Sequence, residues 1–277
     1  MASKPLNDFK YQEFIEERFT IINKDKIEVP FILNEAQEAF LRECTYRNII
    51  LKCRKLGFSS LLLAIAVTKF ILGKNERCVT MSFDATASGK QLERAKHFIR
   101  SYELIRGTKI PMKYNSKSEM VFEGTDDKGS SYTNTLRIGT ARSNSFGRGD
   151  DITFLHLTEV SQCDNLEELL SGVGEALVNG AMTTMETTAN GFNVFKRFWD
   201  EAVMGKRNYT PMFFDPSWEY SPEFLDYKQQ ELGNLYDQEY PSTPEQAFIA
   251  SGSTYLDKLA MAKYLHEVQD VPTLQTV

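Results

Sequence analysis

The 277-residue sequence has few of the residues that build metal centres or disulfide frameworks. It contains four cysteines and three histidines, and no two cysteines form a CxxC pair. Scattered in this way, they argue against a zinc site and against structural disulfides, and they favour reduced thiols in a cytosolic protein. With 42% hydrophobic residues, a chain of this length can instead bury a full core, as one large or two small domains.

The sequence also lacks an excess of positive charge and any long apolar run. Its net charge of −6 argues against a broadly basic surface for nucleic acid. A local DNA contact remains compatible with this charge, because affinity follows local phosphate neutralisation. The most apolar run, residues 61–67, is too short to span a bilayer, and residues 1–10 carry no signal-peptide core. We therefore expect a soluble protein with no membrane partner.

What is present is a short apolar strand, a basic loop and an apolar helix in direct succession over residues 48–72. Free N–H groups at a helix start and the positive end of its dipole converge on one point and bind phosphate. Ser59 stands two positions after the closing Gly57, where a phosphate loop places the hydroxyl that ligates Mg²⁺. The predicted nucleotide-binding residues of this loop are Lys52, Cys53, Arg54, Lys55, Leu56, Gly57, Phe58, Ser59 and Ser60, and Arg54 is also predicted to act in catalysis.

This loop departs in two places from the usual pattern G-x-x-x-x-G-K-[ST]. Phe58 occupies the lysine position, and Lys52 occupies the position of the first glycine. From the end of the strand, Lys52 can still reach the β- and γ-phosphates of a nucleotide. The alternative is a basic turn after a buried strand, with Ser59 as an ordinary helix N-cap.

Gln37 lies near the start of a predicted helix and has two interpretations. Asn34 is a suitable N-cap, and Gln37, three residues later, is the expected partner in a capping box. The functional interpretation is that the amide of Gln37 recognises adenine, because an amide can both donate to and accept from the edge of the base.

A second apolar strand begins at residue 152 and ends at an acidic residue, Glu159. Such a strand end is where related ATPases keep the carboxylate that orients the attacking water, usually beside an Asp that supports Mg²⁺. Here Thr158 replaces that Asp, and its hydroxyl can hydrogen-bond only a Mg²⁺-bound water. The alternative for Glu159 is a glutamate in the first turn of a helix, stabilised by the helix dipole.

A third strand, near residues 181–187, is followed by hydroxyl and amide side chains. Thr187, Thr188 and Asn190 are expected to sense the γ-phosphate, and the alternative is a plain β-to-α turn. Alternating strands and helices predict an α/β fold with a mostly parallel sheet and helices on both faces. We expect an N-terminal helical segment at 1–30, a core at 31–214 and a C-terminal helical segment at 215–277.

With these motifs in order, the chain resembles the ATPase domain of the large terminase subunit of tailed bacteriophages, motors that push double-stranded DNA into a procapsid. The resemblance runs from about residue 31 to residue 253 and depends on residues 52–59, 155–160, 186–191 and 238–248. It implies a RecA/ASCE-type P-loop fold with a small helical lid. It also implies ATP and Mg²⁺ as cofactors, and double-stranded DNA, the small terminase subunit and the portal protein as partners. The motor would be a homo-oligomeric ring in the cytoplasm of an infected bacterial host.

The resemblance also assigns roles to individual residues. It implies that Gln37 recognises adenine, that Ser59 ligates Mg²⁺ and that Glu159 is the catalytic carboxylate. Lys52 matches the displaced lysine of some members, and Thr187 and Thr188 would couple hydrolysis to movement. Related motors carry an arginine finger, which acts on a neighbouring subunit, in the region of Arg148; Arg142 is the second choice.

Two observations limit this interpretation. Full-length large terminases continue into an RNase H-like nuclease domain, and the residues after 253 cannot supply one, so we expect translocation without DNA cutting. The standard lysine and aspartate are both missing, which leaves a non-hydrolysing nucleotide-binding assembly protein as an alternative. A second alternative is a helicase-like DNA-dependent ATPase, although the chain has no room for the second RecA-like domain that such a helicase needs. Phosphate release measured with and without DNA separates the three.

Overall fold

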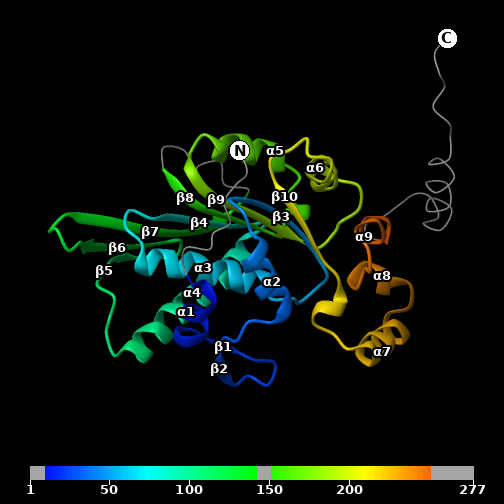
Figure 1. Ribbon diagram of the computed structural model, residues 1–277, viewed down its shortest axis with the longest axis horizontal. Coiled ribbons are helices and arrows are strands. Elements are labelled where there is room, and N and C mark those ends of the chain that lie inside the picture. The colour runs from blue at the N-terminus through cyan, green and yellow to red at the C-terminus, as the bar shows by residue number, and fades with distance from the viewer. Residues whose placement is uncertain (1–9, 142–150, 251–277) are drawn as a thin grey trace, which may run out of the picture.

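The computed structural model of the protein describes residues 10–141 and 151–250. An eight-stranded sheet lies at the centre of this part of the chain, in the order β10-β3-β9-β8-β4-β7-β6-β5 (Figure 1). The strands are β3 (Arg47–Lys52), β4 (Arg77–Ser82), β5 (Met112–Asn115), β6 (Glu119–Thr125), β7 (Ser131–Thr140), β8 (Ile152–Thr158), β9 (Leu177–Thr187) and β10 (Thr210–Phe214).

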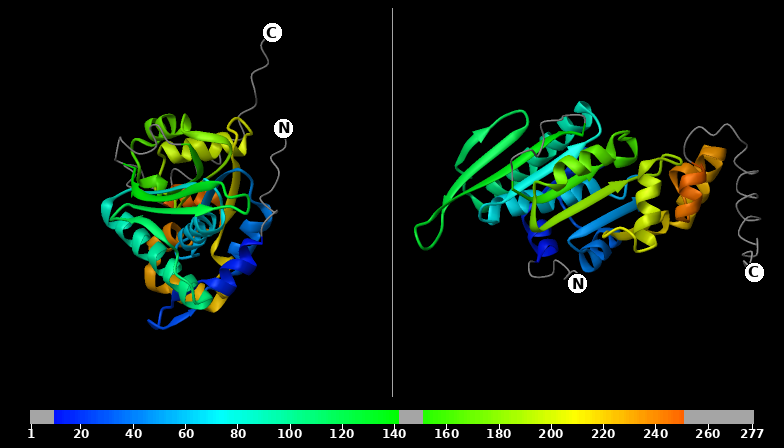
Figure 2. Two further views of the ribbon diagram at one scale, coloured as in Figure 1. Left: turned by 90° about the vertical axis from the view of Figure 1, so that its left-hand side faces the viewer. Right: turned by 90° about the horizontal axis from the view of Figure 1, so that it is seen from above.

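The six strands from β10 to β7 are parallel, which confirms the predicted α/β sheet. Strands β6 and β5 extend it in the antiparallel sense. The β6–β7 hairpin projects at one end of the molecule (Figure 2). In the parallel part, β9 lies between β3 and β8, so the carboxyl ends of these three strands meet at one edge.

Helices cover both faces of the sheet, as the sequence predicts (Figure 1). Two separate hydrophobic cores result, one on each face. The first face carries α1 (Tyr11–Arg18), α2 (Glu35–Glu43), α3 (Phe58–Leu72) and α4 (Ala85–Arg106). The opposite face carries α5 (Leu166–Gly174) and α6 (Val194–Val203).

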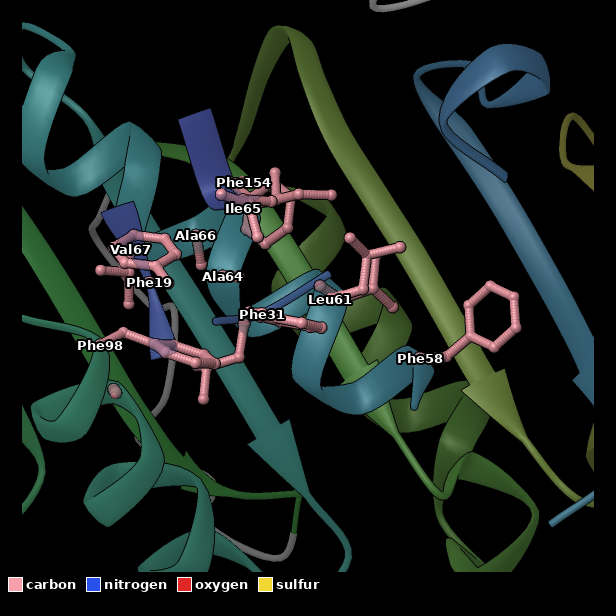
Figure 3. Packing of buried hydrophobic residues seen from close by; sticks show 14 of the residues in the cluster. Phe19, Phe31, Phe58, Leu61, Ala64, Ile65, Ala66, Val67, Phe98 and Phe154 are labelled. Atoms are coloured by element: carbon pink, nitrogen blue, oxygen red, sulfur yellow. The ribbon is translucent and has the colours of Figure 1, made fainter. Parts of the chain in front are cut away.

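Helix α3 runs through the larger core and is buried on nearly all sides. Its side chains, including Leu61 and Ile65, pack between the sheet and the neighbouring helices (Figure 3). A helix that is apolar all round belongs in an interior, and this burial fixes the helix that follows the phosphate loop. The helix ends at Leu72, where the predicted segment 48–72 also ends, and Gly73 is its C-cap.

Smaller elements complete the described chain. Strands β1 (Thr20–Ile22) and β2 (Glu28–Pro30) pair separately from the main sheet, and three short 3₁₀ helices are η1 (Val160–Gln162), η2 (Pro216–Trp218) and η3 (Gly233–Leu235). Helices α7 (Pro222–Leu232), α8 (Tyr236–Glu239) and α9 (Pro244–Ala250) follow the last strand. The domain limits at residues 30 and 214 stay predictions. Within the described ranges, none of the helices has the length and apolarity that crossing a membrane requires.

Candidate active site

The candidate site lies where β3, β9 and β8 end side by side. Thr158 on β8 is directly opposite Glu186 on β9, and Glu186 is opposite Ile50 on β3. A pocket of about 280 Å³ opens at this edge. It is lined by the loop residues Lys52, Lys55, Gly57, Phe58, Ser59 and Ser60, by Thr158 and Glu159, and by Ala87, Lys90, Gln91 and Arg94 of α4.

Gly57 closes the phosphate loop and caps α3. Its φ is +76°, in the left-handed region that favours glycine, and the helix begins at the next residue. The alternative interpretation of Ser59 as the N-cap is therefore wrong. Ser59 lies inside the first turn, and its hydroxyl is directed to other groups.

Gln37 fixes the same glycine from α2. It forms the predicted capping box with Asn34, whose side chain accepts from the Gln37 N–H at 2.9 Å and whose own N–H donates to Gln37 Oε1 at 3.1 Å. The Gln37 Nε2 also donates to the Gly57 carbonyl at 3.0 Å. The capping interpretation is confirmed. Adenine recognition stays a prediction, because the amide of Gln37 is already hydrogen-bonded and the residue is buried.

Lys52 is buried at the end of β3 between two carboxylates. Its Nζ lies 3.2 Å from Glu186 Oε2 and 3.9 Å from Glu159 Oε1. Burial alone would lower the pKa of Lys52, but the two carboxylates outweigh it, and the pKa is raised. The two carboxylates therefore favour the charged form of the displaced lysine, which lies on the wall of the pocket.

Other predicted loop residues direct their side chains elsewhere. Cys53, Leu56 and Phe58 are buried in the core, and burial raises the pKa of the Cys53 thiol to about 12. Of these three, only Phe58 lines the pocket. A phosphate contact from Cys53 or Leu56 would have to use the backbone, as phosphate loops do.

Arg54 points toward the C-terminal helices. Its guanidinium forms an ion pair with Glu239, its N–H donates to the Glu239 carbonyl at 3.4 Å, and its own carbonyl accepts from the Tyr220 hydroxyl at 3.2 Å. Arg54 is not among the residues that line the pocket, whereas its neighbour Lys55 is. The predicted catalytic role of Arg54 remains a prediction.

Glu186 is the centre of the site, although it is not among the predicted site residues. It is fully buried, and its Oε1 accepts from the hydroxyls of Ser59 and Thr158, each at 2.5 Å. Burial favours the neutral acid, but the Lys52 ammonium, with further help from His156 and Ser59, holds the pKa of Glu186 well below its usual range. The sequence signal was a lone charged residue within a strand of small and apolar residues.

Glu159 lies just past the end of β8 with its side chain about one-third exposed to the pocket, at 34%. Its backbone adopts the left-handed conformation, with φ +56°, which is unfavourable for a glutamate and typical of functional positions. Its side chain makes no capping hydrogen bond to the short helix that follows. Burial and the nearby Glu186 charge raise its pKa, against the opposing effect of Lys52.

The predicted coupling residues contact the segment that follows Glu159. The Thr187 hydroxyl is 2.8 Å from the Ser161 hydroxyl, and the Asn190 Nδ2 donates to the Ser161 carbonyl at 3.3 Å. Thr187, Thr188 and Asn190 are not among the pocket-lining residues, so direct contact with a γ-phosphate is not what this arrangement provides. Their coupling role stays a prediction, and the contacts of Thr187 and Asn190 with Ser161 are the route by which they would sense a change at Glu159.

No protein-family model and no curated protein matches the sequence. Among solved structures, the large terminase ATPase domain of Thermus phage P74-26 aligns with 76% of this chain and 92% of its own, at 15% identity and a TM-score of 0.56. The large terminase of bacteriophage HK97 aligns with 94% of this chain at 15% identity and a TM-score of 0.56. The fold is that of a phage large-terminase ATPase domain.

A third match is the large terminase of a thermophilic bacteriophage in complex with ADP, which aligns with 76% of this chain at 14% identity and a TM-score of 0.56. The chain spans 92% of the P74-26 ATPase domain but only about half of the other two large terminases, 52% and 53%. At these identities the terminase likeness establishes the fold, and function has to be argued from the site.

Helix α4 contributes residues that the sequence reasoning did not place in the site. Lys90, Gln91 and Arg94 line the pocket opposite the loop, and Arg94 Nη1 donates to Gln91 Oε1 at 3.3 Å. Lys90 and Arg94 are four residues apart and therefore share one face of the helix. That spacing was the available signal, but only the fold shows which face meets the pocket. Arg148 and Arg142 lie outside the described residues.

The residues of the pocket fit a magnesium ion. Within its lining, Ser59 and Thr158 offer hydroxyl oxygens and Glu159 offers a carboxylate. Glu186 is not part of the lining, but it adds a buried carboxylate behind the two hydroxyls, and its Oε2 faces the Lys52 ammonium at 3.2 Å. Within residues 10–141 and 151–250, no cluster of three or more His, Cys, Asp or Glu forms a metal cage. Mg²⁺ commonly combines one or two protein oxygens with water and substrate phosphates, so the Ser59 hydroxyl with the neighbouring oxygens would be enough to hold it.

A larger hollow, of about 520 Å³, lies beside α1 and α2 and contains none of the predicted site residues. Its lining carries four glutamates, Glu13, Glu16, Glu17 and Glu38, against two basic residues, Lys10 and Arg42. This excess of negative charge would repel the phosphates of a nucleotide, whereas the smaller pocket presents three lysines and an arginine against one glutamate. Charge therefore selects the smaller pocket as the site.

Proposed function

We propose that this chain is the ATPase motor domain of a phage large terminase, which hydrolyses ATP to drive double-stranded DNA into a procapsid. The observation that carries the proposal is the meeting of Lys52, Ser59 and Glu159 in one pocket at the ends of the parallel strands β3 and β8, which lie on either side of β9. A buried cation, a hydroxyl in the first turn of a helix and a partly exposed carboxylate are the groups that ATP hydrolysis requires.

In this proposal the loop and the start of α3 bind the phosphates through backbone N–H groups, and Lys52 neutralises the β- and γ-phosphates. Ser59 would hold Mg²⁺, with Thr158 contributing through a bound water. When bound, Mg²⁺ supplies positive charge to the phosphate oxygens.

Glu159 is positioned for the proton transfer. Its carboxylate orients a water and accepts one of its protons as the water oxygen attacks the γ-phosphorus. The bond from that phosphorus to the bridging oxygen breaks, giving ADP and inorganic phosphate. The raised pKa of Glu159 makes it a better proton acceptor than an ordinary carboxylate, and its partial exposure gives it access to the pocket.

Movement of DNA would begin at the segment joined to Glu159. Ser161 is tied to Thr187 and Asn190 at the end of β9, so a shift of Glu159 after hydrolysis reaches the β9–α6 connection. Double-stranded DNA, the small terminase subunit, the portal protein and a ring of identical subunits complete the proposed motor. This choice of partners follows the resemblance to phage large terminases, whose ATPase domain has the same fold.

The direct test measures phosphate release by the purified chain with and without double-stranded DNA. Glu159→Gln should bind ATP with near-normal affinity and lose several orders of magnitude in rate, because only transition-state stabilisation is removed. The control is Glu168→Gln, which changes an exposed carboxylate on α5 and should keep the wild-type rate.

Three results would contradict the proposal. Loss of ATP binding or of folding in Glu159→Gln would make that carboxylate structural. ATP binding by the wild type without phosphate release under any condition would indicate a non-hydrolysing assembly protein. Stimulation by single-stranded but not double-stranded DNA would indicate a helicase-like ATPase.

A further inference from the structure

The end of β8 lacks the aspartate that commonly supports Mg²⁺ in such ATPases, because Thr158 stands in its place. The neighbouring strand carries a carboxylate at the matching position, since Glu186 is directly opposite Thr158 in the β8–β9 register. We propose that Glu186 supplies from β9 the negative charge that an aspartate at position 158 would supply from β8, and so supports the Mg²⁺ held by Ser59. This inference rests on the function proposed above.

The hydrogen bonds of Glu186 support the assignment. A hydroxyl that ligates a cation uses an oxygen lone pair, so its hydrogen must point to an acceptor on the other side. Glu186 Oε1 is that acceptor for Ser59, at 2.5 Å, and it also accepts from Thr158 at 2.5 Å. The two hydroxyl oxygens are 3.3 Å apart. One carboxylate oxygen therefore orients both hydroxyls, which leaves their lone pairs for a metal ion or its water.

The burial and charge of Glu186 point the same way. It is fully buried yet paired with the Lys52 ammonium at 3.2 Å, and His156 Nε2 lies 3.5 Å from its Oε1. A buried carboxylate is costly unless it is paired, so its presence in the core of a strand needs a reason. In a low-dielectric interior, a fixed negative charge behind Ser59 attracts a cation more strongly than a solvated one would.

A purely structural role would use the same contacts, because Glu186 joins β9, β8 and α3. The two roles differ in what happens to metal binding. If the carboxylate is only structural, its removal weakens nucleotide binding equally with and without Mg²⁺. If the carboxylate supports the metal, its removal lowers the affinity for Mg²⁺ selectively. Glu186 is thus proposed as a positioning residue, and the decisive measurement is the metal dependence of nucleotide binding.

The experiment titrates the full chain with a fluorescent ADP analogue, in EDTA and at a series of Mg²⁺ concentrations. Mg²⁺ increases the affinity for the nucleotide, and the measured quantity is the Mg²⁺ concentration that gives half of this increase. In Glu186→Gln that concentration should be roughly 10- to 100-fold higher, the usual effect of losing a group that orients a metal ligand. Its affinity in EDTA should be kept or increased, because one negative charge near the phosphates is gone. The control Glu76→Gln, at a carboxylate paired with Lys69 at 2.9 Å, should show wild-type Mg²⁺ dependence.

A rescue variant keeps the test decisive. Thr158→Asp together with Glu186→Gln moves the carboxylate back to β8 and should restore the Mg²⁺ dependence, whereas a structural role predicts no rescue. Thermal melting shows that each variant is folded. Unchanged Mg²⁺ dependence in Glu186→Gln, or no rescue in a folded double variant, would overturn the inference. A wild-type chain that binds no nucleotide would instead overturn the proposed function.

Discussion

At the scale of single residues, Lys52 and Phe58 explain why the phosphate loop departs from its usual pattern. The Phe58 ring packs against Phe40 and Phe214, with ring centroids 5.9 and 4.6 Å apart. A lysine at position 58 would place an ammonium in that apolar environment without a partner, which is costly. Position 52 adjoins two carboxylates, so the charge is compensated there.

The first prediction concerns this ion pair. Lys52→Ala should abolish ATP hydrolysis and weaken ATP binding. It should also destabilise the protein by about 3–5 kcal/mol, because Glu186 remains buried without its partner. Lys55→Ala, which removes an exposed side chain, should be milder in turnover and change the free energy of unfolding by less than about 0.5 kcal/mol. Denaturant unfolding and phosphate release provide the two measurements.

A double variant separates stability from catalysis at this pair. Lys52→Ala with Glu186→Gln should recover part of the lost stability and none of the lost hydrolysis. Wild-type turnover in Lys52→Ala would contradict the assignment of the displaced lysine.

Arg54 is the subject of the second prediction, because its structural contacts and its predicted role differ. Its ion pair with Glu239 is partly solvent-exposed, so Arg54→Ala and Glu239→Ala should each change stability by less than about 1 kcal/mol. If Arg54 acts on the phosphates, only Arg54→Ala should lower the rate of phosphate release. Equal turnover in both variants would remove Arg54 from the catalytic machinery and leave it as a contact to the C-terminal helices.

At the scale of elements, the phosphate loop is held in shape by the N-terminus of α2. A Cβ added at Gly57 would lie 2.6 Å from Gln37 Nε2, and Gly57 also has a positive φ. Helix α2, the loop and helix α3 therefore meet at one glycine that no other residue can replace without strain. This connects the capping box of α2 to the geometry of the nucleotide pocket.

The third prediction tests that junction. Gly57→Ala should destabilise the protein by about 1–3 kcal/mol, through backbone strain and the contact with Gln37. Gly89→Ala is the matched control, because Gly89 lies in α4 with nothing within 4 Å of the added Cβ, and it should stabilise by about 0.5–1 kcal/mol. Denaturant unfolding compares the two.

Adding Gln37→Ala to Gly57→Ala should relieve the side-chain contact and leave the φ strain in place. The non-additivity of the two substitutions then measures the contact itself. A neutral Gly57→Ala would show that the loop adopts a different conformation in solution.

At the scale of the whole molecule, the active site is expected to be completed by a second subunit. Arg148 belongs to a sequence segment rich in Ser, Gly and Asn that precedes β8 in the chain and lies outside the described residues. An arginine finger stabilises charge on the transferring phosphate and contributes on the order of 10³-fold or more in rate. Isolated subunits should therefore hydrolyse ATP slowly, with specific activity rising with protein concentration.

The fourth prediction is complementation between inactive subunits. Mixing Arg148→Ala with Glu159→Gln should restore part of the activity, because some interfaces then pair an intact Glu159 site with an intact Arg148. The measurement is phosphate release in assemblies shown to contain both variants. No recovery in such assemblies would mean that Arg148 acts within its own subunit or only supports the structure. Arg142→Ala in place of Arg148→Ala tests the second choice in the same way.

The sequence by itself determined the elements that depend on local patterns. The apolar strand ending at Lys52, the glycine after the basic loop and the apolar run of α3 lie within 26 consecutive residues, 47–72. Signals of this kind need no distant partner, and they also placed β8 and the Asn34–Gln37 box. The short β1, β2 and β5 were not predicted, because three or four residues carry too little pattern. Helix α5 was not predicted either, although Asn165 and Glu168 have the spacing of a helix start.

Only the tertiary structure decided which strand ends meet. The sheet order places β9 between β3 and β8, so Glu186 adjoins Ser59 and Thr158 although they are 127 and 28 residues away along the chain. The fold likewise turns one face of α4 toward the loop and buries the amide of Gln37 against Gly57. Strand order and helix orientation come from burying both faces of the sheet at once, a property of the whole chain that no local pattern contains.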